Sequence, residues 1–183
     1  MQSVIMLMIL SGLVCGQPAQ LPIGKLRTIS VCELLSRRID YNGKMIKVRG
    51  EVKGGGHGVW LVADTNCDFR VVTDSVVWPN YIYLTYPSPK KEHGEMYAEF
   101  VVDADSVAAA ERTIQRAGFQ EGKDRIFQTF IGRFVTYGDL RLRSNAGTPG
   151  SRRVGFGPVG LDAPAQILIK EILETKLVRG EQQ

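Results

Sequence analysis

Two segments, Val48-Arg49-Gly50-Glu51-Val52 and Phe130-Ile131-Gly132-Arg133-Phe134, share one pattern, a glycine at the centre of a strand-like run with apolar residues on either side. Glycine weakens the interior of a strand because it loses much backbone entropy on folding and has no side chain to pack. Within a strand it often marks a bulge or a sharp bend. The two glycines therefore predict a small sheet that curls toward a barrel.

The strands predicted around these glycines follow a period of two. Ile46, Val48 and Val52 alternate with charged residues, as in a strand with one buried face. A glycine-rich turn at residues 54–58 then predicts a hairpin. Further runs are rich in β-branched and aromatic residues, which favour strands. The predicted strands are residues 46–52, 59–64, 81–86, 96–102, 126–137 and 165–173.

Two helices are predicted, one before the first strand and one inserted before the second glycine strand. Ser30-Val31-Cys32-Glu33 has the form of a capping box, in which the serine caps the helix and the glutamate reaches back to the serine N–H. An apolar stripe continues this helix to Ile39. The inserted helix starts at Asp103 or Asp105 and ends near Ala117.

Together these elements predict a mostly β (α+β) domain, an OB-fold-like five-stranded partly open barrel with an N-terminal helix and an inserted helix. The glycine in the first strand, the hairpin after it and the helix before the later strands all suit this fold. The alternative is a β-sandwich, which needs more strands than the sequence supplies. We expect residues 1–16 to form a signal peptide, 17–27 a linker, 28–176 the barrel domain and 177–183 a flexible tail.

The first 16 residues differ from the rest in composition. The stretch from residue 4 to residue 10 is unbroken apolar sequence, and no charged side chain occurs before Lys25. This run is shorter than the roughly 20 apolar residues that a spanning helix needs. Val14 and Gly16 fit the small-residue rule for cleavage after Gly16. We therefore expect an exported protein, periplasmic or secreted, with no stable membrane span after leader cleavage. The alternatives are an uncleaved N-terminal anchor and a lipoprotein acylated at Cys15.

The net charge bears on which partners the protein binds, and the cysteine content bears on its disulfide bonding. The formal net charge of +4 over 183 residues is mild, so a nucleic-acid partner is not expected. Cleavage of the leader leaves two cysteines, Cys32 and Cys67. In an oxidising compartment such an even pair predicts a disulfide. The alternative is two buried free thiols.

Several motifs resemble those of a group of small exported bacterial proteins with an OB-fold-like structure. They are Ser-Val-Cys-Glu-Leu-Leu at 30–35, Tyr-Asn-Gly-Lys at 41–44, Val-Arg-Gly-Glu-Val at 48–52 and the distal Cys67. Near the C-terminus, Gly-Phe-Gly-Pro-Val-Gly-Leu at 155–161 and Ala-Pro-Ala-Gln-Ile-Leu-Ile at 163–169 resemble the last turn and closing strand of that group.

One position departs from that group. Its last turn reads Gly-His-Leu-Gly, whereas Pro158 or Val159 stands here where the histidine would fall. A role tied to that histidine therefore does not carry over to this chain. The resemblance implies the fold and export, and it brings no known activity.

No catalytic residue, metal site or cofactor is expected. The two histidines, His57 and His93, lie apart and lack the spacing of zinc ligands. The glycine loop at 54–58 lacks the terminal lysine and the following helix of a phosphate-binding loop. The Gly-x-Ser-x-Gly motif of a nucleophile elbow is absent from the sequence. Acidic residues such as Asp64 and Asp103 match no nuclease motif and are interpreted as loop residues and helix caps.

The candidate ligand-binding residues are Arg49, Trp60, Tyr81 and Tyr83. If the apolar residues of the first three strands point inward, alternation places these four side chains on the outer face. OB-folds bind oligonucleotides and oligosaccharides on this face, where aromatic rings and basic groups contribute stacking and charge. The alternative is that the inserted helix or the loop at 87–95 covers the rings and leaves an ordinary second core.

The sequence thus predicts an exported OB-like binding module. Its ligand would be an oligosaccharide, a peptide or another envelope component, including a partner protein of the envelope. One alternative is an envelope hydrolase or nuclease built on the same barrel. The other is a structural or assembly subunit that uses the aromatic residues as an interface.

Overall fold

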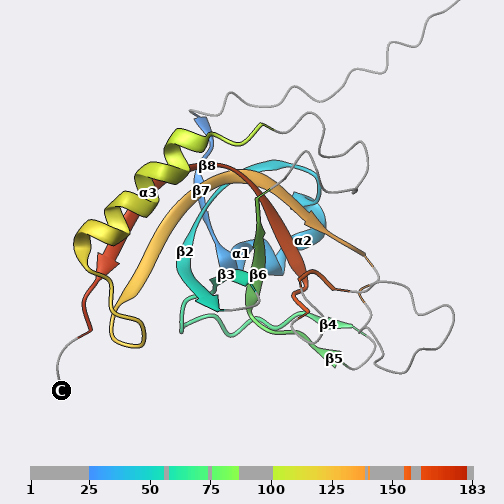
Figure 1. Ribbon diagram of the computed structural model, residues 1–183. Helices are drawn as coiled ribbons and strands as arrows, with labels where there is room; N and C mark the ends of the chain where they lie inside the picture. The colour runs from blue at the N-terminus through green and yellow to red at the C-terminus, as the bar shows by residue number, and fades with distance from the viewer. Residues whose placement is uncertain are drawn as a thin grey trace, which may run out of the picture.

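The computed structural model describes residues 25–55, 58–73, 76–86, 101–138, 140, 155–157 and 162–180. The expected signal peptide and most of the expected linker lie outside the described residues. Figure 1 shows long, curved strands wrapped around a common interior. In chain order the elements are β1 (Thr28–Ser30), α1 (Val31–Ser36), α2 (Arg38–Tyr41), β2 (Met45–Gly55), β3 (Gly58–Val62), β4 (Val72–Thr73), β5 (Val76–Val77), β6 (Tyr81–Thr85), α3 (Ala104–Ala117), β7 (Arg125–Thr136) and β8 (Ala165–Val178).

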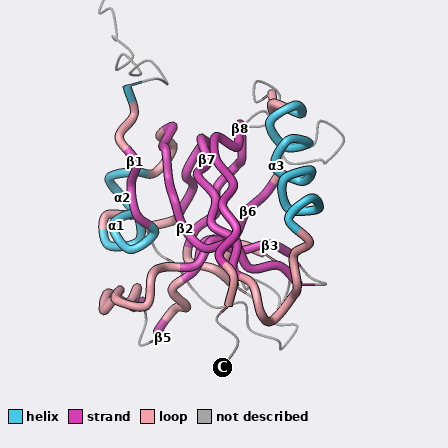
Figure 2. Tube along the Cα trace, turned by 90° about the vertical axis from the view of Figure 1, so that its left-hand side faces the viewer, coloured by secondary structure: helices cyan, strands magenta, loops and turns pink. Residues whose placement is uncertain are grey.

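Five strands form a barrel. β2, β3, β6, β8 and β7 are hydrogen-bonded in that order, and pairing between β2 and β7 closes the ring. Within the ring β6 and β8 run parallel, and the other neighbours run antiparallel. β1 adds a short parallel strand to β2. Figure 2 shows α1 and α2 on one side of the strands and α3 on the other.

This architecture confirms the predicted mostly β, OB-like five-stranded barrel with an N-terminal helical segment and an inserted helix. The β2–β7 hydrogen bonds close the ring, where a partly open barrel was expected. These hydrogen bonds run from Met45 to Val52 along β2, so closure uses most of the strand.

The two glycines of the shared sequence pattern lie where the strand pairing changes. At Gly132 the β7–β8 register shifts, which is a bulge or irregularity. An added Cβ there would lie 2.5 Å from the carbonyl oxygen of Leu168, so the backbone approach requires glycine. At Gly50 the strand paired with one edge of β2 changes, because β1 pairs with β2 up to Arg49 and β3 pairs with it from Glu51 onward. The register shift at Gly132 agrees with the predicted bulge or bend, and a bend at Gly50 stays a prediction.

Inward-facing side chains of the strands form one continuous core. Alternation along β2, β3 and β6 points apolar residues inward, as predicted, and places the intervening residues outside. Leu34 and Leu35 of α1 and Ala110 of α3 join this core, so both helical segments pack against the strands. The buried strand residues include Ile46, Val48, Leu61, Ile82, Leu84, Phe130, Phe134, Ile167 and Ile169.

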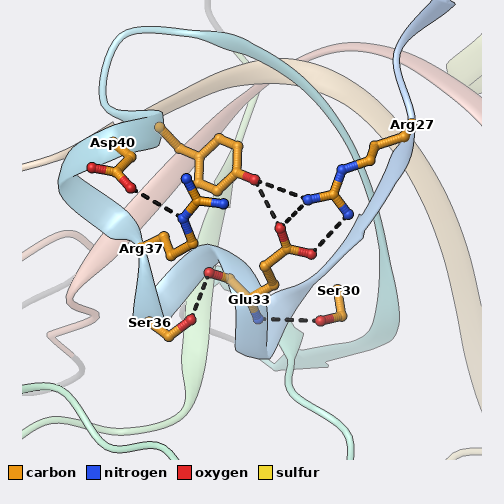
Figure 3. Close-up of polar contacts among 7 residues, drawn as sticks. Arg27, Ser30, Glu33, Ser36, Arg37 and Asp40 are labelled. Carbon is orange, nitrogen blue, oxygen red and sulfur yellow. Dashed lines mark hydrogen bonds and ion pairs between the residues drawn. The ribbon is translucent and has the colours of Figure 1, made fainter.

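The N-terminal helix begins as predicted but is broken. The Ser30 hydroxyl accepts a hydrogen bond from the Glu33 backbone N–H at 3.1 Å. The Glu33 carboxylate does not complete a capping box with the Ser30 N–H; it accepts hydrogen bonds from the Arg27 guanidinium and, at 2.8 Å, from the Tyr41 hydroxyl (Figure 3). The helix is interrupted at Arg37, and α2 follows as a separate turn.

The contacts of Glu33 join β1, α1 and α2. Hydrogen bonding to Arg27 and then to Tyr41 holds the pKa of Glu33 below its ordinary value. Because the break at Arg37 rotates the chain, Ile39 is 53% exposed, whereas the predicted stripe placed it in the core.

Other differences from the sequence prediction concern strand limits. Val101 and Val102, expected at the end of a strand at 96–102, belong to no strand, and residues 96–100 lie outside the described part of the chain. β8 extends to Val178, so Leu177 and Val178 of the expected flexible tail belong to the barrel wall. β1 and the small β4–β5 hairpin are too short to show a period and were not predicted.

The predicted disulfide is present. Cys32 of α1 and Cys67, which follows β3, are joined with their Cα atoms 5.6 Å apart. This separation is ordinary for a disulfide. The bond ties the N-terminal helix to the chain beyond the β2–β3 hairpin.

Substitution of Gly132 tests whether close backbone approach is required. We expect Gly132→Ala to lower the free energy of unfolding by at least about 2 kcal/mol, because the new Cβ meets main-chain atoms that cannot rotate away. Gly50→Ala should lower the free energy of unfolding by less, because the nearest contacts of its added Cβ, at 2.9 Å, are side-chain atoms of Leu61 and Val31. Gly54→Ala is the matched control, since no atom lies within 4 Å of its Cβ. Urea denaturation measures all three, and equal stability of the Gly132 and Gly54 variants would contradict the account.

Removal of the disulfide tests its contribution. We expect the double variant Cys32→Ala, Cys67→Ala to lose about 3–4 kcal/mol of stability, the value of the chain-entropy treatment for a loop of 35 residues. Denaturant unfolding with and without dithiothreitol measures the loss. The native chain should become less stable in the reductant, and the double variant should not respond to it.

Candidate functional site

The registers of the barrel strands align outward-facing side chains in one row. Lys53 on β2 pairs with Trp60 on β3, and Trp60 pairs with Tyr83 on β6. Tyr83 in turn pairs with Gln166 on β8, and Gln166 pairs with Val135 on β7. The row therefore runs around the outside of the barrel and brings together residues from distant parts of the sequence.

Three of the predicted binding residues, Trp60, Tyr81 and Tyr83, form a ring cluster that we call the aromatic face. Trp60 and Tyr83 belong to the row, and Tyr81 lies two residues before Tyr83 on β6. The Trp60 and Tyr81 ring centroids are 6.1 Å apart in an edge-to-face arrangement. Those of Trp60 and Tyr83 are 6.3 Å apart with tilted planes. Both separations are in the range of favourable aromatic pairs. Each of the three side chains is half-buried, so the aromatic face is neither a closed core nor fully open to solvent.

Neighbouring residues fix the position of Tyr83. It packs against a second, smaller hydrophobic cluster of Val135, Phe156 and Leu168, which lies outside the main core. Gly58 leaves room on the other side, because an added Cβ would lie 2.7 Å from Cε2 of the tyrosine ring. The glycine at this hairpin position therefore has a packing role as well as a turn role.

Polar atoms with unusual surroundings flank the aromatic face. Within the described part of the chain, Nε1 of Trp60 and Oδ1 of Asp162 are buried and have no hydrogen-bond partner. Burial, and then the negative charge of Asp162, raise the pKa of Tyr81 above its ordinary value. The Asp162 carboxylate is thus close enough for its charge to act on the Tyr81 hydroxyl.

Arg49, the fourth predicted binding residue, lies apart from the aromatic face. It is four residues along β2 from Lys53, a distance of about 13 Å at the rise of a strand. Its guanidinium is 3.5 Å from the Glu174 carboxylate, and its side chain is 45% exposed. The structure therefore brings the three rings together and places the arginine elsewhere.

Arg49 lines a separate groove of about 460 Å³. The groove carries charges of both signs, since Lys176 and Asp64 also line it and Glu174 pairs with Arg49. Its remaining lining comes from β1, β2, β7 and β8. These residues are Thr28, Ile29, Ser30, Gly50, Phe127 and Val178.

Among the residues that the structure describes, no group of three or more His, Cys, Asp or Glu side chains is arranged to hold a metal ion. His57 and His93 lie outside the described residues. In the described ranges no helix has the length and apolar character needed to cross a bilayer.

Comparison of the chain with models of protein families, with curated proteins and with solved structures finds no match. The function is therefore argued from the geometry of the site.

Sequence reasoning missed the polar and apolar neighbours of the aromatic face. Lys53 could have been found from strand alternation and the hairpin register. Gln166 could not, because it meets Tyr83 through the parallel pairing of β6 and β8. Asp162 and Phe156 lie in irregular chain before β8, where no period indicates which way a side chain points.

The proximity of Asp162 and Tyr81 can be tested by titration. Replacing the carboxylate by Asp162→Asn should lower the pKa of Tyr81, because the phenolate then forms without a nearby negative charge. The pKa should stay above that of a free tyrosine, since burial is the larger cause. Ultraviolet titration of the chain and of its Tyr81→Phe variant isolates this group. Asp40→Asn on α2 is the control and should leave the Tyr81 titration unchanged, whereas no change with Asp162→Asn would refute the contact.

Proposed function

We propose that this chain is an exported binding module that holds a neutral oligosaccharide against the aromatic face. The position of the face supports the proposal. β3 and β6 are the second and third strands of the barrel, and OB-folds commonly bind oligonucleotides and oligosaccharides on that surface. Rings of Trp60, Tyr81 and Tyr83 gather there, at half-burial, from two adjacent strands.

The observation that carries the choice of ligand is the pair of unused polar atoms beside Tyr81. Nε1 of Trp60 can only donate a hydrogen bond, and an ionised Asp162 carboxylate can only accept one. A sugar hydroxyl can both donate and accept, so a polyol has the chemistry to partner either atom. A phosphate diester can only accept, and the carboxylate would repel it. The chemistry of the face therefore favours a neutral sugar over a nucleic acid.

The remaining polar residues of the row agree with this choice. Gln166 offers an amide donor and acceptor next to Tyr83, which suits hydroxyl groups. Lys53 is the single cation of the row, and its Nζ atom lies 3.9 Å from Oε1 of Glu51. Proteins bind polyanions with several basic groups, so a row with one partly neutralised cation is a poor match for a polyanion.

Export is supported by the disulfide and by the leader pattern in the sequence. Cys32–Cys67 would persist in an oxidising compartment, and the first 16 residues have the form of a cleaved signal peptide. An exported oligosaccharide-binding protein would meet glycans of the cell envelope or of the surroundings.

Loss of one ring tests the proposal. We expect Trp60→Ala to weaken binding of hexasaccharides by at least about tenfold, because it removes the ring that contacts both tyrosines. Isothermal titration with maltohexaose and chitohexaose measures binding, and the melting temperature of each variant reports folding. Arg49→Ala is the matched control, and it should bind as the native chain does because it lies outside the aromatic face.

Two outcomes would overturn the proposal. The first is that neither hexasaccharide binds to the native chain. The second is that Trp60→Ala melts much earlier while its affinity is unchanged, which would show that the ring belongs to a covered core.

A further inference from the structure

A second pair of rings lies beside the aromatic face. Tyr137, just after β7, stacks on Phe156 with ring centroids 4.8 Å apart and planes 13° apart. Phe156 is 6% exposed, whereas Tyr137 is 44% exposed. One face of the tyrosine ring is thus supported by a buried ring.

The backbone holds the supporting ring in place. Phe156 and Ala163 exchange two backbone hydrogen bonds, at 2.9 and 2.8 Å, as an isolated antiparallel bridge. Ala163 lies two residues before β8, so the bridge fixes Phe156 to the barrel. Tyr137 therefore stacks on a ring with a fixed position, which is the arrangement that suits stacking of a ligand.

The two groups of rings are continuous. Phe156 belongs to the small cluster with Val135 and Leu168, and Tyr83 of the aromatic face packs against that cluster. Val135 lies in the row that contains Trp60 and Tyr83, and Tyr137 is two residues C-terminal to Val135. Tyr137 follows the end of β7 directly, and its stacking partner Phe156 joins it to the cluster that Tyr83 contacts.

We infer that Tyr137 forms a second subsite, and that the ligand is a linear oligosaccharide long enough to cover the aromatic face and Tyr137 together. The inference rests on the proposed function and adds a requirement for chain length. The face of an aromatic ring is electron-rich, and the C–H groups on one side of a sugar ring are weakly positive, so the two stack. A disaccharide fills the aromatic face alone, whereas a longer chain also reaches the supported ring of Tyr137.

Length dependence is the test. Isothermal titration compares maltose with maltohexaose and chitobiose with chitohexaose on the native chain and on Tyr137→Ala. One of the two hexasaccharides is expected to bind the native chain. For that sugar, we expect the affinity of Tyr137→Ala to be about tenfold weaker than that of the native chain. For the matching disaccharide, the two affinities should agree within about twofold. Tyr137→Phe should keep the native affinity for both lengths because it keeps the ring.

Two further variants serve as controls, one for loss of stability and one for the position of the ring. Tyr137→Leu keeps an apolar contact with Phe156 but removes the ring, so it should show the same length-dependent loss even where the alanine variant is less stable. Tyr86→Ala is the matched control, because Tyr86 is also 44% exposed but lies near Glu111 of α3, and it should bind both lengths as the native chain does.

The outcomes separate this inference from the proposed function. Equal losses for both lengths, or no loss for either, with Trp60→Ala still impaired, would overturn the second subsite and leave the proposed function standing. Failure of the native chain to bind any of the four sugars would overturn both.

Discussion

The close approach of β7 and β8 at Gly132 is the constraint on which the barrel depends. β7 is hydrogen-bonded to β2 along one edge and to β8 along the other, so it joins the first and last strands of the ring. At Gly132 the carbonyl of Leu168 occupies the space where any side chain would begin. The register shift there lets one long strand bend sharply enough to serve both neighbours.

Closure of the ring also creates the outer surface. Because five strands alternate in and out together, the residues that do not enter the core align from strand to strand around the barrel. Trp60 and Tyr83 become direct neighbours, and Gln166 joins them through the one parallel pairing of the ring. The aromatic face is thus a product of register, and a slip by one residue would turn its rings inward.

Local signals account for what the sequence could predict. Ser30 caps a helix, the alternation of β2 places Ile46 and Val48 inside, and the glycine-centred run at Gly132 marks a register shift, all within a few residues of chain. The pair Cys32 and Cys67 could be predicted because removal of the expected leader would leave only these two cysteines. Export, which the leader pattern indicates, stays a prediction.

Long-range contacts account for what the sequence could not show. Arg49 shares a strand and a face with Lys53, but only the register reveals that Lys53 meets Trp60 and that Arg49 meets Glu174. Glu33 binds Arg27 and Tyr41 in place of completing a capping box, a competition among side chains that no single motif describes.

The disulfide has one more consequence, for the integrity of the chain. The covalent loop from Cys32 to Cys67 contains all of β2 and β3, and therefore both Lys53 and Trp60. If a protease cut the backbone once anywhere inside that loop, the two fragments would stay linked through sulfur, and barrel contacts would still hold their strands in register. A chain cut once between β2 and β3 would therefore remain one covalent molecule.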